Sequence, residues 1–274
     1  MGHVLSDEQV GFFRRHGYLT PLRAIAETAA ADCRRRLESY ESETGAPAFE
    51  TLHIKPHLYF SWSWELTRSA AITGALRDLI GPDVLVLASR FWIKEPGDGA
   101  FVTWHQDTAY FGLEPPEMIT LWIALTEAGP DNGGMRFLPG SHRGRARRHV
   151  ETEDPRNLLS RGQRVEDVDE TGAVDVVLRP GEFSIHHGQT LHDSAANESS
   201  DRRIGFGLMA MPTRVRSTTG RRSATLLCGD DAYGHWELDP EPAGDRDPVI
   251  WDLMHQADTG YRDRSIRQEA DTAD

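Results

Sequence analysis

The chain has few cysteines, no long apolar run and fewer basic than acidic residues. Cys33 and Cys228 are its only cysteines, too few for a disulfide framework or a thiolate metal site. A metal site would therefore use histidine and carboxylate ligands. No segment approaches the roughly 18–20 apolar residues that cross a bilayer, and Asp7 and Glu8 stand where a secretory signal would be apolar. We therefore expect a cytoplasmic protein without a membrane segment.

The charge balance argues against nucleic acid as a partner. The chain carries 30 Lys and Arg against 43 Asp and Glu, a formal net charge of −13. Binding to a phosphate backbone needs a surplus of basic residues that releases counterions. One basic run, residues 143–149, is a local exception, and such runs are usually solvated loops. We therefore expect a small-molecule substrate, and the sequence leaves the oligomeric state open.

The order of the predicted elements indicates an α+β fold. Residues 5–40 and 64–80 have helical composition, and short runs rich in β-branched and aromatic residues follow. These predicted strands are residues 84–93, 118–126, 174–178, 182–187 and 203–211. Helices followed by strands, without alternation, favour a mainly β jelly roll with flanking helices over a doubly wound sheet.

We expect a single domain over residues 1–274, because all-β domains of this size are often undivided. It would comprise a helical part at about 1–82, a jelly-roll core at about 83–215 and a C-terminal extension at about 216–274. Residues 144–175 and the tail after 261 are expected to be irregular. The first of these segments, together with residues 53–59, is predicted to cover the active site.

A metal site is suggested by His105-x-Asp107. In a strand, residues i and i+2 share a face, so the two side chains can converge on one point. His192 follows about 85 residues later. Two histidines and one carboxylate leave three open metal positions, the arrangement of non-haem Fe(II) oxygenases. Those positions suit a 2-oxo acid and dioxygen, and an arginine can bind the distal carboxylate of the acid.

The ordered motifs resemble the phytanoyl-CoA dioxygenase family of Fe(II)- and 2-oxoglutarate-dependent oxygenases. The matching segments are residues 104–107, 120–122, 132–142, 181–183 and 192–203. The resemblance runs from the N-terminal helices to about Pro212. It implies a double-stranded β-helix core that holds iron between two sheets.

The resemblance also implies a role for each matching residue. The implied iron ligands are His105, Asp107 and His192. The residues implied to bind 2-oxoglutarate are Arg203 and Ser194 at its carboxylate, Trp122 packing beside it, and Lys55 through a looser match. Asp107 occupies the position where halogenating relatives have Ala or Gly, which favours hydroxylation over halogenation.

Several points stay open at the level of sequence. Only one of the adjacent His186 and His187 can face the core, and a core histidine is more often a hydrogen-bonded structural residue than a metal ligand. His142 is also expected to be structural. Arg202 should point away from Arg203. The candidate substrate residues are Trp104, Phe91, Tyr110 and His57.

The reaction itself also leaves alternatives. The implied chemistry converts 2-oxoglutarate to succinate and CO2 while it oxidises an unactivated C–H of a natural product or an amino-acid or sugar-type metabolite. Ring closure, desaturation and epimerisation use the same ligands. A cupin-like isomerase or sensor would keep the metal ligands but would not need Arg203 and Ser194 at their spacing.

Overall fold

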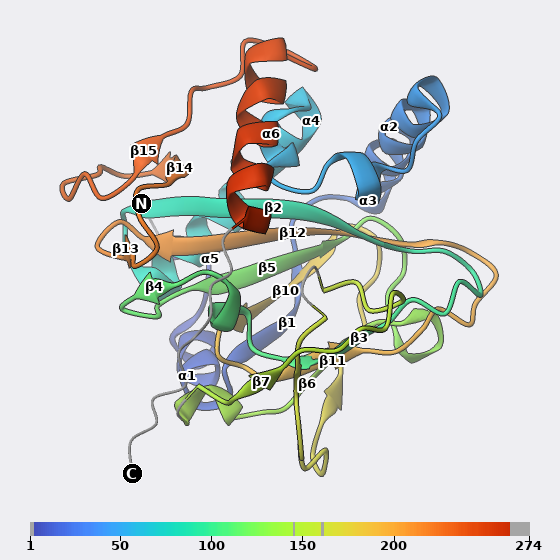
Figure 1. Cartoon of the computed structure of the whole chain (residues 1–274). Helices are drawn as coiled ribbons and strands as arrows, with labels where there is room; N and C mark the ends of the chain where they lie inside the picture. The colour runs from blue at the N-terminus through green and yellow to red at the C-terminus, as the bar shows by residue number, and fades with distance from the viewer. Residues whose placement is uncertain (1–2, 145, 160–161, 264–274) are drawn as a thin grey trace.

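Two β-sheets face each other in the computed structural model, which describes residues 3–144, 146–159 and 162–263 (Figure 1). The larger sheet has seven strands in the order β1-β10-β5-β12-β2-β14-β15, and the smaller has four in the order β3-β11-β6-β9. The larger comprises β1 (Tyr18–Arg23), β2 (Val84–Lys94), β5 (Ile119–Ala124), β10 (Glu182–His187), β12 (Arg203–Pro212), β14 (Ser223–Cys228) and β15 (Glu237–Leu238). The smaller comprises β3 (Val102–His105), β6 (Met135–Phe137), β9 (Val174–Asp175) and β11 (His192–Ser194). The predicted jelly roll with flanking helices is confirmed.

Side chains along the central strand β12 point alternately to the two faces of the larger sheet, toward the helices and toward the smaller sheet. Ile204, Phe206 and Leu208 join the apolar cluster formed with the helices. Arg203 and Met209 point to the opposite face, toward the smaller sheet, where they line a cavity. The strand is hydrogen-bonded to β2 on one side and to β5 on the other. Each of these strands therefore presents one face to the helices and the other to the space between the sheets.

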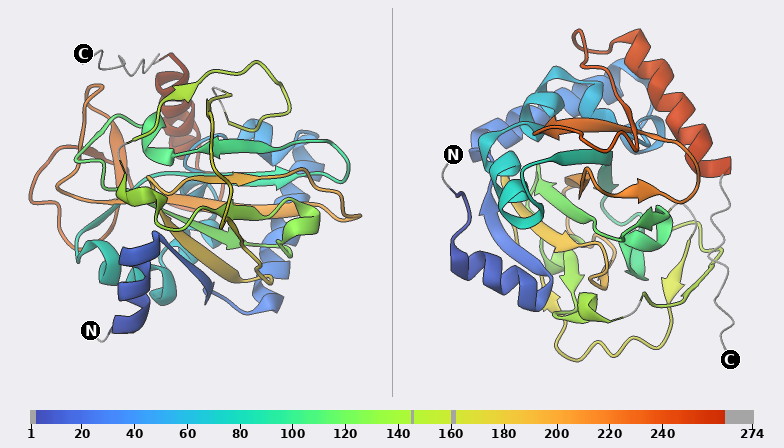
Figure 2. Two further views of the ribbon diagram at one scale, coloured as in Figure 1. Left: turned by 90° about the horizontal axis from the view of Figure 1, so that it is seen from below. Right: turned by 90° about the vertical axis from the view of Figure 1, so that its left-hand side faces the viewer.

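Helices cover the outer face of the larger sheet. They are α1 (Asp7–His16), α2 (Glu27–Thr44), α3 (Ala48–Thr51), α4 (Ser61–Thr67), α5 (Ala70–Ile80) and α6 (Pro248–Asp263). Figure 2 shows the N-terminal helices, in blue and cyan, gathered on one side of the sheets. None of the helices in the described ranges is long and apolar enough to cross a membrane.

The N-terminal part differs from the predicted continuous helix over residues 5–40. Gly17 ends α1 with φ 81, a left-handed conformation that favours glycine. The chain then forms β1, which pairs with β10 at the edge of the larger sheet. The predicted helix over 64–80 is divided into α4 and α5, because helical hydrogen bonding ends at Arg68.

The later segments also depart from the predicted boundaries. β14 pairs with β2, so the larger sheet extends beyond residue 215 into the expected C-terminal extension. The strand predicted over 174–178 is limited to β9. α6 continues to Asp263, and the tail from 264 on lies outside the described residues.

Short elements connect the sheets. They are η1 (Pro56–Leu58), η2 (Asp107–Tyr110), η3 (Pro130–Asn132), η4 (Ser141–Arg143), β4 (Leu113–Glu114), β7 (His149–Val150), β8 (Arg164–Val165) and β13 (Arg216–Ser217). β13 pairs with β4, and β7 with β8. The described residues of 144–175 are otherwise irregular, as expected.

Candidate metal centre and co-substrate pocket

Three buried side chains meet between the sheets. His105 ends β3, His192 begins β11, and the two residues are paired across the antiparallel strands. Asp107 follows as the first residue of η2, so it reaches the site through the turn after β3 and not from the same strand face. One potential ligand atom from each residue lies within 4.8 Å of the others. Asp107 Oδ1 is 3.4 Å from His105 Nε2 and 3.7 Å from His192 Nε2.

Backbone carbonyls orient the two imidazoles. His105 Nδ1 donates to the carbonyl of Thr103, and His192 Nδ1 donates to the carbonyl of Thr190, each at 2.9 Å. A proton held on Nδ1 leaves the Nε2 lone pair directed at the centre of the cluster. Such outer hydrogen bonds fix the tautomer of metal-binding histidines.

Asp107 is oriented in the same way. Its Oδ2 accepts a hydrogen bond from the Thr120 hydroxyl at 2.6 Å and lies 3.1 Å from His186 Nε2. The other oxygen, Oδ1, therefore faces His105 and His192. His186 is the inward-facing member of the histidine pair, whereas the His187 ring packs beside His142.

The electrostatics of this cluster favour metal-binding protonation states. Burial lowers the pKa of His192 well below its usual value, which keeps this imidazole neutral. Burial alone would raise the pKa of Asp107, but the nearby His192, His105 and His186 outweigh it and hold that pKa well below its usual range. A carboxylate and neutral imidazoles are the forms that bind a divalent metal.

Two cations lie beside the cluster on the inner face of the larger sheet. Arg203 is 2% exposed and forms no hydrogen bond or ion pair with any residue in the described ranges, although its guanidinium lies 5.2 Å from the Trp122 ring centroid. Lys94 is paired with Arg203 across the strands. The Lys94 ammonium is fully buried, donates to Ser194 Oγ at 2.7 Å and to the Ser194 carbonyl at 3.1 Å, and also contacts the carbonyl of Ala195.

Burial perturbs both cations. It lowers the pKa of Lys94 to about 6, with the neighbouring Arg203 adding to the effect, and it lowers the pKa of Arg203 to about 10. Buried charges are normally paired with a counter-charge. A buried arginine on an aromatic ring, beside a buried lysine whose protonation a bound carboxylate would favour, therefore forms a site suited to a carboxylate.

The comparisons with known proteins agree with this geometry. A model of the phytanoyl-CoA dioxygenase family matches residues 13–205. The chain belongs to this family. A probable alpha-ketoglutarate-dependent hypophosphite dioxygenase of Stutzerimonas stutzeri is 38% identical over 150 residues, 54% of this chain and 52% of that protein. The match thus spans about half the length of that curated relative.

Solved structures of similar proteins cover more of the chain. The non-heme monooxygenase ThoJ, in its apo form, has a TM-score of 0.81 at 30% identity over 93% of this chain and 96% of that one. CytC3 with Fe(II) and alpha-ketoglutarate has a TM-score of 0.65 at 25% identity, over 86% and 93% of the two chains. As a member of the phytanoyl-CoA dioxygenase family, this chain has residues that fit both groups: the His105–Asp107–His192 cluster fits Fe(II), and the buried cations fit 2-oxoglutarate.

The structure brings most of the predicted co-substrate residues together with the metal cluster. Among the residues that line one common cavity are His105, Asp107, Thr120, Trp122, His186, His192, Ser194 and Arg203. Lys55 is an exception and corrects the sequence-based prediction. Its ammonium forms a buried ion pair with Asp239 at 2.6 Å and bonds Ser223 at 2.8 Å, outside this cavity.

Lys94 is the cation that sequence reasoning missed. It is one of only two lysines in the chain, with Lys55 the other, whereas arginine supplies every other basic side chain apart from histidine. Its position at the end of a predicted strand, two residues after Trp92, was a usable signal.

Among the candidate substrate residues, only Tyr110 lines the larger cavity that contains Asp107. Phe91 points to the helix face, where it packs against Trp62 and Phe206. Trp104 lies on the outer face of the smaller sheet under the Arg136 guanidinium.

His57 is also placed away from the substrate cavity. It is fully buried between the hydroxyls of Ser89 and Thr225, at 2.7 and 2.9 Å. The predictions for Phe91, Trp104 and His57 are therefore corrected, since strand parity and burial direct these side chains elsewhere. His53 takes the place expected of His57 and lines the larger cavity.

Proposed function

We propose that the protein is an oxygenase that uses Fe(II), 2-oxoglutarate and dioxygen to hydroxylate an unactivated C–H of a small molecule. The observation that carries the proposal is a buried His-Asp-His cluster that shares one cavity with the buried Arg203, which is paired across the strands with the buried Lys94. Bound iron would supply the oxidation chemistry as 2-oxoglutarate is converted to succinate and CO2. The protein supplies ligand geometry, a carboxylate site and a pocket that excludes water.

The chain's own residues divide this work. His105, Asp107 and His192 would hold the metal, and the Thr120 hydroxyl would keep one Asp107 oxygen turned away from it. Arg203 would bind the distal carboxylate of 2-oxoglutarate by charge-assisted hydrogen bonds.

Lys94 and Trp122 complete the co-substrate site in this proposal. The Lys94 ammonium, through its bond to Ser194, would place a second positive charge beside the same carboxylate. Trp122 would form the wall against which the Arg203 guanidinium rests.

Asp107 favours hydroxylation over halogenation, because the carboxylate occupies the metal position that a halide would need. Ring closure, desaturation and epimerisation remain compatible with the same ligands and depend on how a substrate lies in the larger cavity. The relative from S. stutzeri is named for hypophosphite, a very small phosphorus oxyanion. The cavity beside Asp107 measures about 340 Å³ and is lined by several aromatic rings, which supports a larger organic substrate here.

The test is the conversion of 2-oxoglutarate to succinate with added Fe(II) and ascorbate, together with the iron content after reconstitution. His105→Ala, Asp107→Ala and His192→Ala should each abolish turnover and reduce bound iron. His142→Ala is the matched control and should retain iron, because the His142 side chain contacts the Arg14 carbonyl outside the cluster. Parent-like iron binding by His192→Ala would contradict the ligand assignment.

The same assay separates the oxygenase from a metal-binding isomerase or sensor. Such a protein would bind a divalent metal through the three ligands but would form no succinate. The burial of Arg203 and Lys94 supports the oxygenase, because a non-redox metal site has no use for two cations so close to its ligands.

A further inference from the structure

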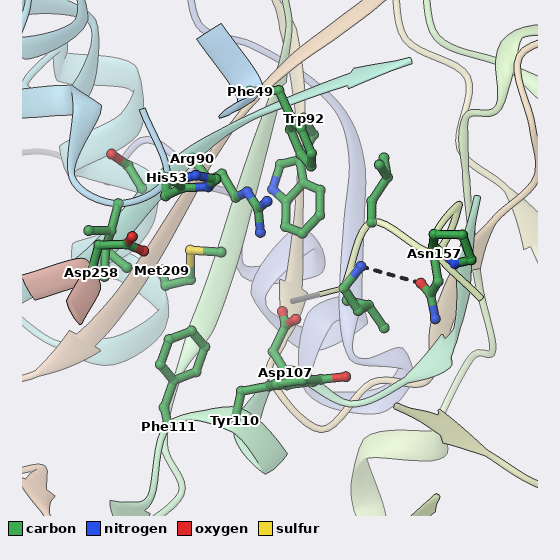
Figure 3. A pocket seen from close by; sticks show the side chains of 16 residues that line it. Phe49, His53, Arg90, Trp92, Asp107, Tyr110, Phe111, Asn157, Met209 and Asp258 are labelled. Carbon is green, nitrogen blue, oxygen red and sulfur yellow. Dashed lines mark hydrogen bonds between the residues drawn. The ribbon is translucent and has the colours of Figure 1, made fainter. Parts of the chain in front are cut away.

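The larger cavity meets the cavity around the metal cluster and Arg203, the co-substrate cavity. Trp92, Asp107 and Met209 line both of them. Because Asp107 belongs to the metal cluster, the junction of the two cavities adjoins the metal site. In Figure 3 the Met209 side chain and the Asp107 carboxylate point into the larger cavity. A substrate in this cavity would therefore lie against Met209 as it approaches the metal.

Strand pairing explains the position of Met209. It lies directly opposite Thr120 on β5, and the Thr120 hydroxyl donates to Asp107. Residues directly opposite each other on antiparallel strands have Cβ atoms about 4.5–5.5 Å apart. Gly205 and Gly207, the preceding residues on the same face of β12, have no side chain. Met209 is therefore the side chain that β12 places next to a residue bonded to a metal ligand.

A thioether in this position is exposed to the chemistry of the site. The methionine sulfur is readily oxidised to a sulfoxide. When Fe(II), 2-oxoglutarate and dioxygen are bound and the larger cavity holds no substrate, no substrate C–H is within reach of the oxidation. We infer that Met209 is then oxidised, and that it is the modification site of unproductive turnover. This inference rests on the proposed oxygenase function and adds a reaction of the chain itself.

The atoms and electrons of this step balance. The bond between C1 and C2 of 2-oxoglutarate breaks and CO2 leaves, while one oxygen atom of dioxygen enters the new carboxylate of succinate. The other oxygen atom bonds to the Met209 sulfur. A sulfur lone pair supplies the two electrons that a substrate C–H would otherwise supply, and no proton is taken up or released.

Oxidation would change the wall of the larger cavity. A sulfoxide is polar and chiral, whereas the thioether is apolar. The oxidised protein should therefore bind an apolar substrate more weakly. Methionine sulfoxide reductases reverse the modification, so the loss of substrate binding would be reversible.

Two other oxidisable side chains are less favourably placed than Met209. Trp92 borders the same junction, but the Arg90 guanidinium carbon lies 4.8 Å from its ring centroid and covers one face of the indole. Met135 lines the co-substrate cavity, which bound 2-oxoglutarate would occupy, and it is not among the residues that line the larger cavity.

Exposure separates this reaction from ordinary oxidation in solution. Met135 is partly exposed, whereas Met209 is 6% exposed. Susceptibility to a dissolved oxidant follows exposure. Hydrogen peroxide added to the protein without iron should therefore oxidise Met135 before Met209, and turnover at the metal should reverse this order.

The experiment incubates the protein in air with Fe(II), 2-oxoglutarate, ascorbate and catalase, which removes peroxide. Succinate and oxygen addition to each peptide are measured by mass spectrometry. Trypsin should release residues 204–214, which contain both Met209 and Met211, and fragment ions assign the oxygen to one of them. We expect the gain of one oxygen atom at Met209, no gain when 2-oxoglutarate or dioxygen is omitted, and loss of the added oxygen after treatment with methionine sulfoxide reductase.

Two variants test the assignment. Met209→Leu removes the sulfur but keeps an apolar side chain of similar volume, so residues 204–214 should gain no oxygen. Met211→Leu is the matched control, because Met211 lies in the same peptide, is fully buried and packs in an apolar cluster. This control should still gain oxygen at Met209. Melting temperature and bound iron are measured for both variants to show that they are folded and loaded.

The outcomes separate this inference from the oxygenase proposal. Succinate formed while Met209 stays unmodified would refute the inference and leave the proposed function standing. Oxygen added to Trp92 or Met135 in place of Met209, or oxidation of Met209 without 2-oxoglutarate, would also overturn the inference. Neither succinate nor sulfoxide would contradict both proposals.

Discussion

Gly205→Ala is a small substitution for which the structure predicts a large effect. A Cβ atom at Gly205 would lie 1.8 Å from Trp122 Cζ2 and 2.0 Å from Cε2. Carbon atoms in contact are separated by about 3.5–4.0 Å, so the indole would have to move by roughly 2 Å. β12 cannot retreat instead, because it is hydrogen-bonded to β2 and β5 on its two sides.

The magnitude follows from two contributions. Overpacking of a well-filled core costs about 1–3 kcal/mol, and displacement of Trp122 also removes its contact with the Arg203 guanidinium, worth about 0.5–2 kcal/mol. The sum, about 1.5–5 kcal/mol, should lower the melting temperature by roughly 3–20 °C for a chain of this size. The apparent affinity for 2-oxoglutarate should fall about 10-fold or more, because Arg203 loses the ring that positions it.

Iron binding should survive in this variant, since the ligands lie on η2 and the smaller sheet. Gly244→Ala is the control, because a Cβ at Gly244 would meet no atom within 4 Å. In the double variant Gly205→Ala with Trp122→Leu the clash is relieved, so the melting temperature should recover while 2-oxoglutarate affinity stays low. A parent-like melting temperature for Gly205→Ala, or no recovery in the double variant, would refute the packing argument.

Three further substitutions test the co-substrate and metal sites. Burial lowers the pKa of Lys94 to about 6, and a bound carboxylate should raise this pKa again. The parent should therefore take up a proton when it binds 2-oxoglutarate at pH 8, and its affinity for 2-oxoglutarate should weaken as pH rises above 6. Calorimetry in two buffers of different ionisation enthalpy measures this proton uptake, which should be absent in Lys94→Met. Thr120→Val removes the hydroxyl bonded to Asp107 and should weaken metal binding about 10-fold, measured by competition with a chelator. Arg203→Ala should raise the 2-oxoglutarate concentration needed for half-maximal turnover roughly 30-fold or more, which corresponds to a loss of about 2–5 kcal/mol of binding free energy. Arg202→Ala should change this concentration little, because Arg202 pairs with Glu41 on the helix side. Equal effects of the two substitutions would contradict the assignment of these arginines to opposite faces of the sheet.

The sequence predicted the metal cluster well because its information is local. The spacing of His105 and Asp107 and the distance from His192 to Arg203 lie within short segments, and the order of the family's motifs does the rest. One detail could not be predicted. β3 ends at His105, so Asp107 reaches the site from the first turn of η2 and not from the strand face that the i, i+2 spacing predicted.

The cations show where sequence reasoning was insufficient. Lys55 and Lys94 have the same residue type, and both are buried. Their difference lies in what the distant chain places beside them: Asp239 from the C-terminal region neutralises Lys55, whereas Lys94 faces Arg203. Contacts between residues so far apart in sequence depend on the fold, and the hydrophobic periodicity of the sequence does not predict them.

The substrate side chains depended on strand parity. Trp104 precedes His105 and should have been assigned to the opposite face of the strand by alternation alone. Phe91 was harder to assign, because β2 is apolar on both faces over much of its length and its pattern does not reveal which residues face the helices. The register of β2 with β12 settles the matter, since it sets Phe91 opposite Phe206 in the helix-facing core.

That same register links folding to co-substrate binding. Pairing Arg203 with Lys94 places two cationic side chains on adjacent strands, an arrangement that is destabilising when like charges lie directly opposite each other. The protein reduces the repulsion by lowering the pKa of Lys94 and by resting Arg203 on Trp122, which in turn requires Gly205 beneath the indole. Each of these features reduces the repulsion between Lys94 and Arg203 only in part, whereas a bound dicarboxylate would neutralise the two positive charges directly. Because a ligand that binds only the folded state stabilises it, the strain of the paired cations is the physical reason that 2-oxoglutarate should bind here and hold the two central strands together.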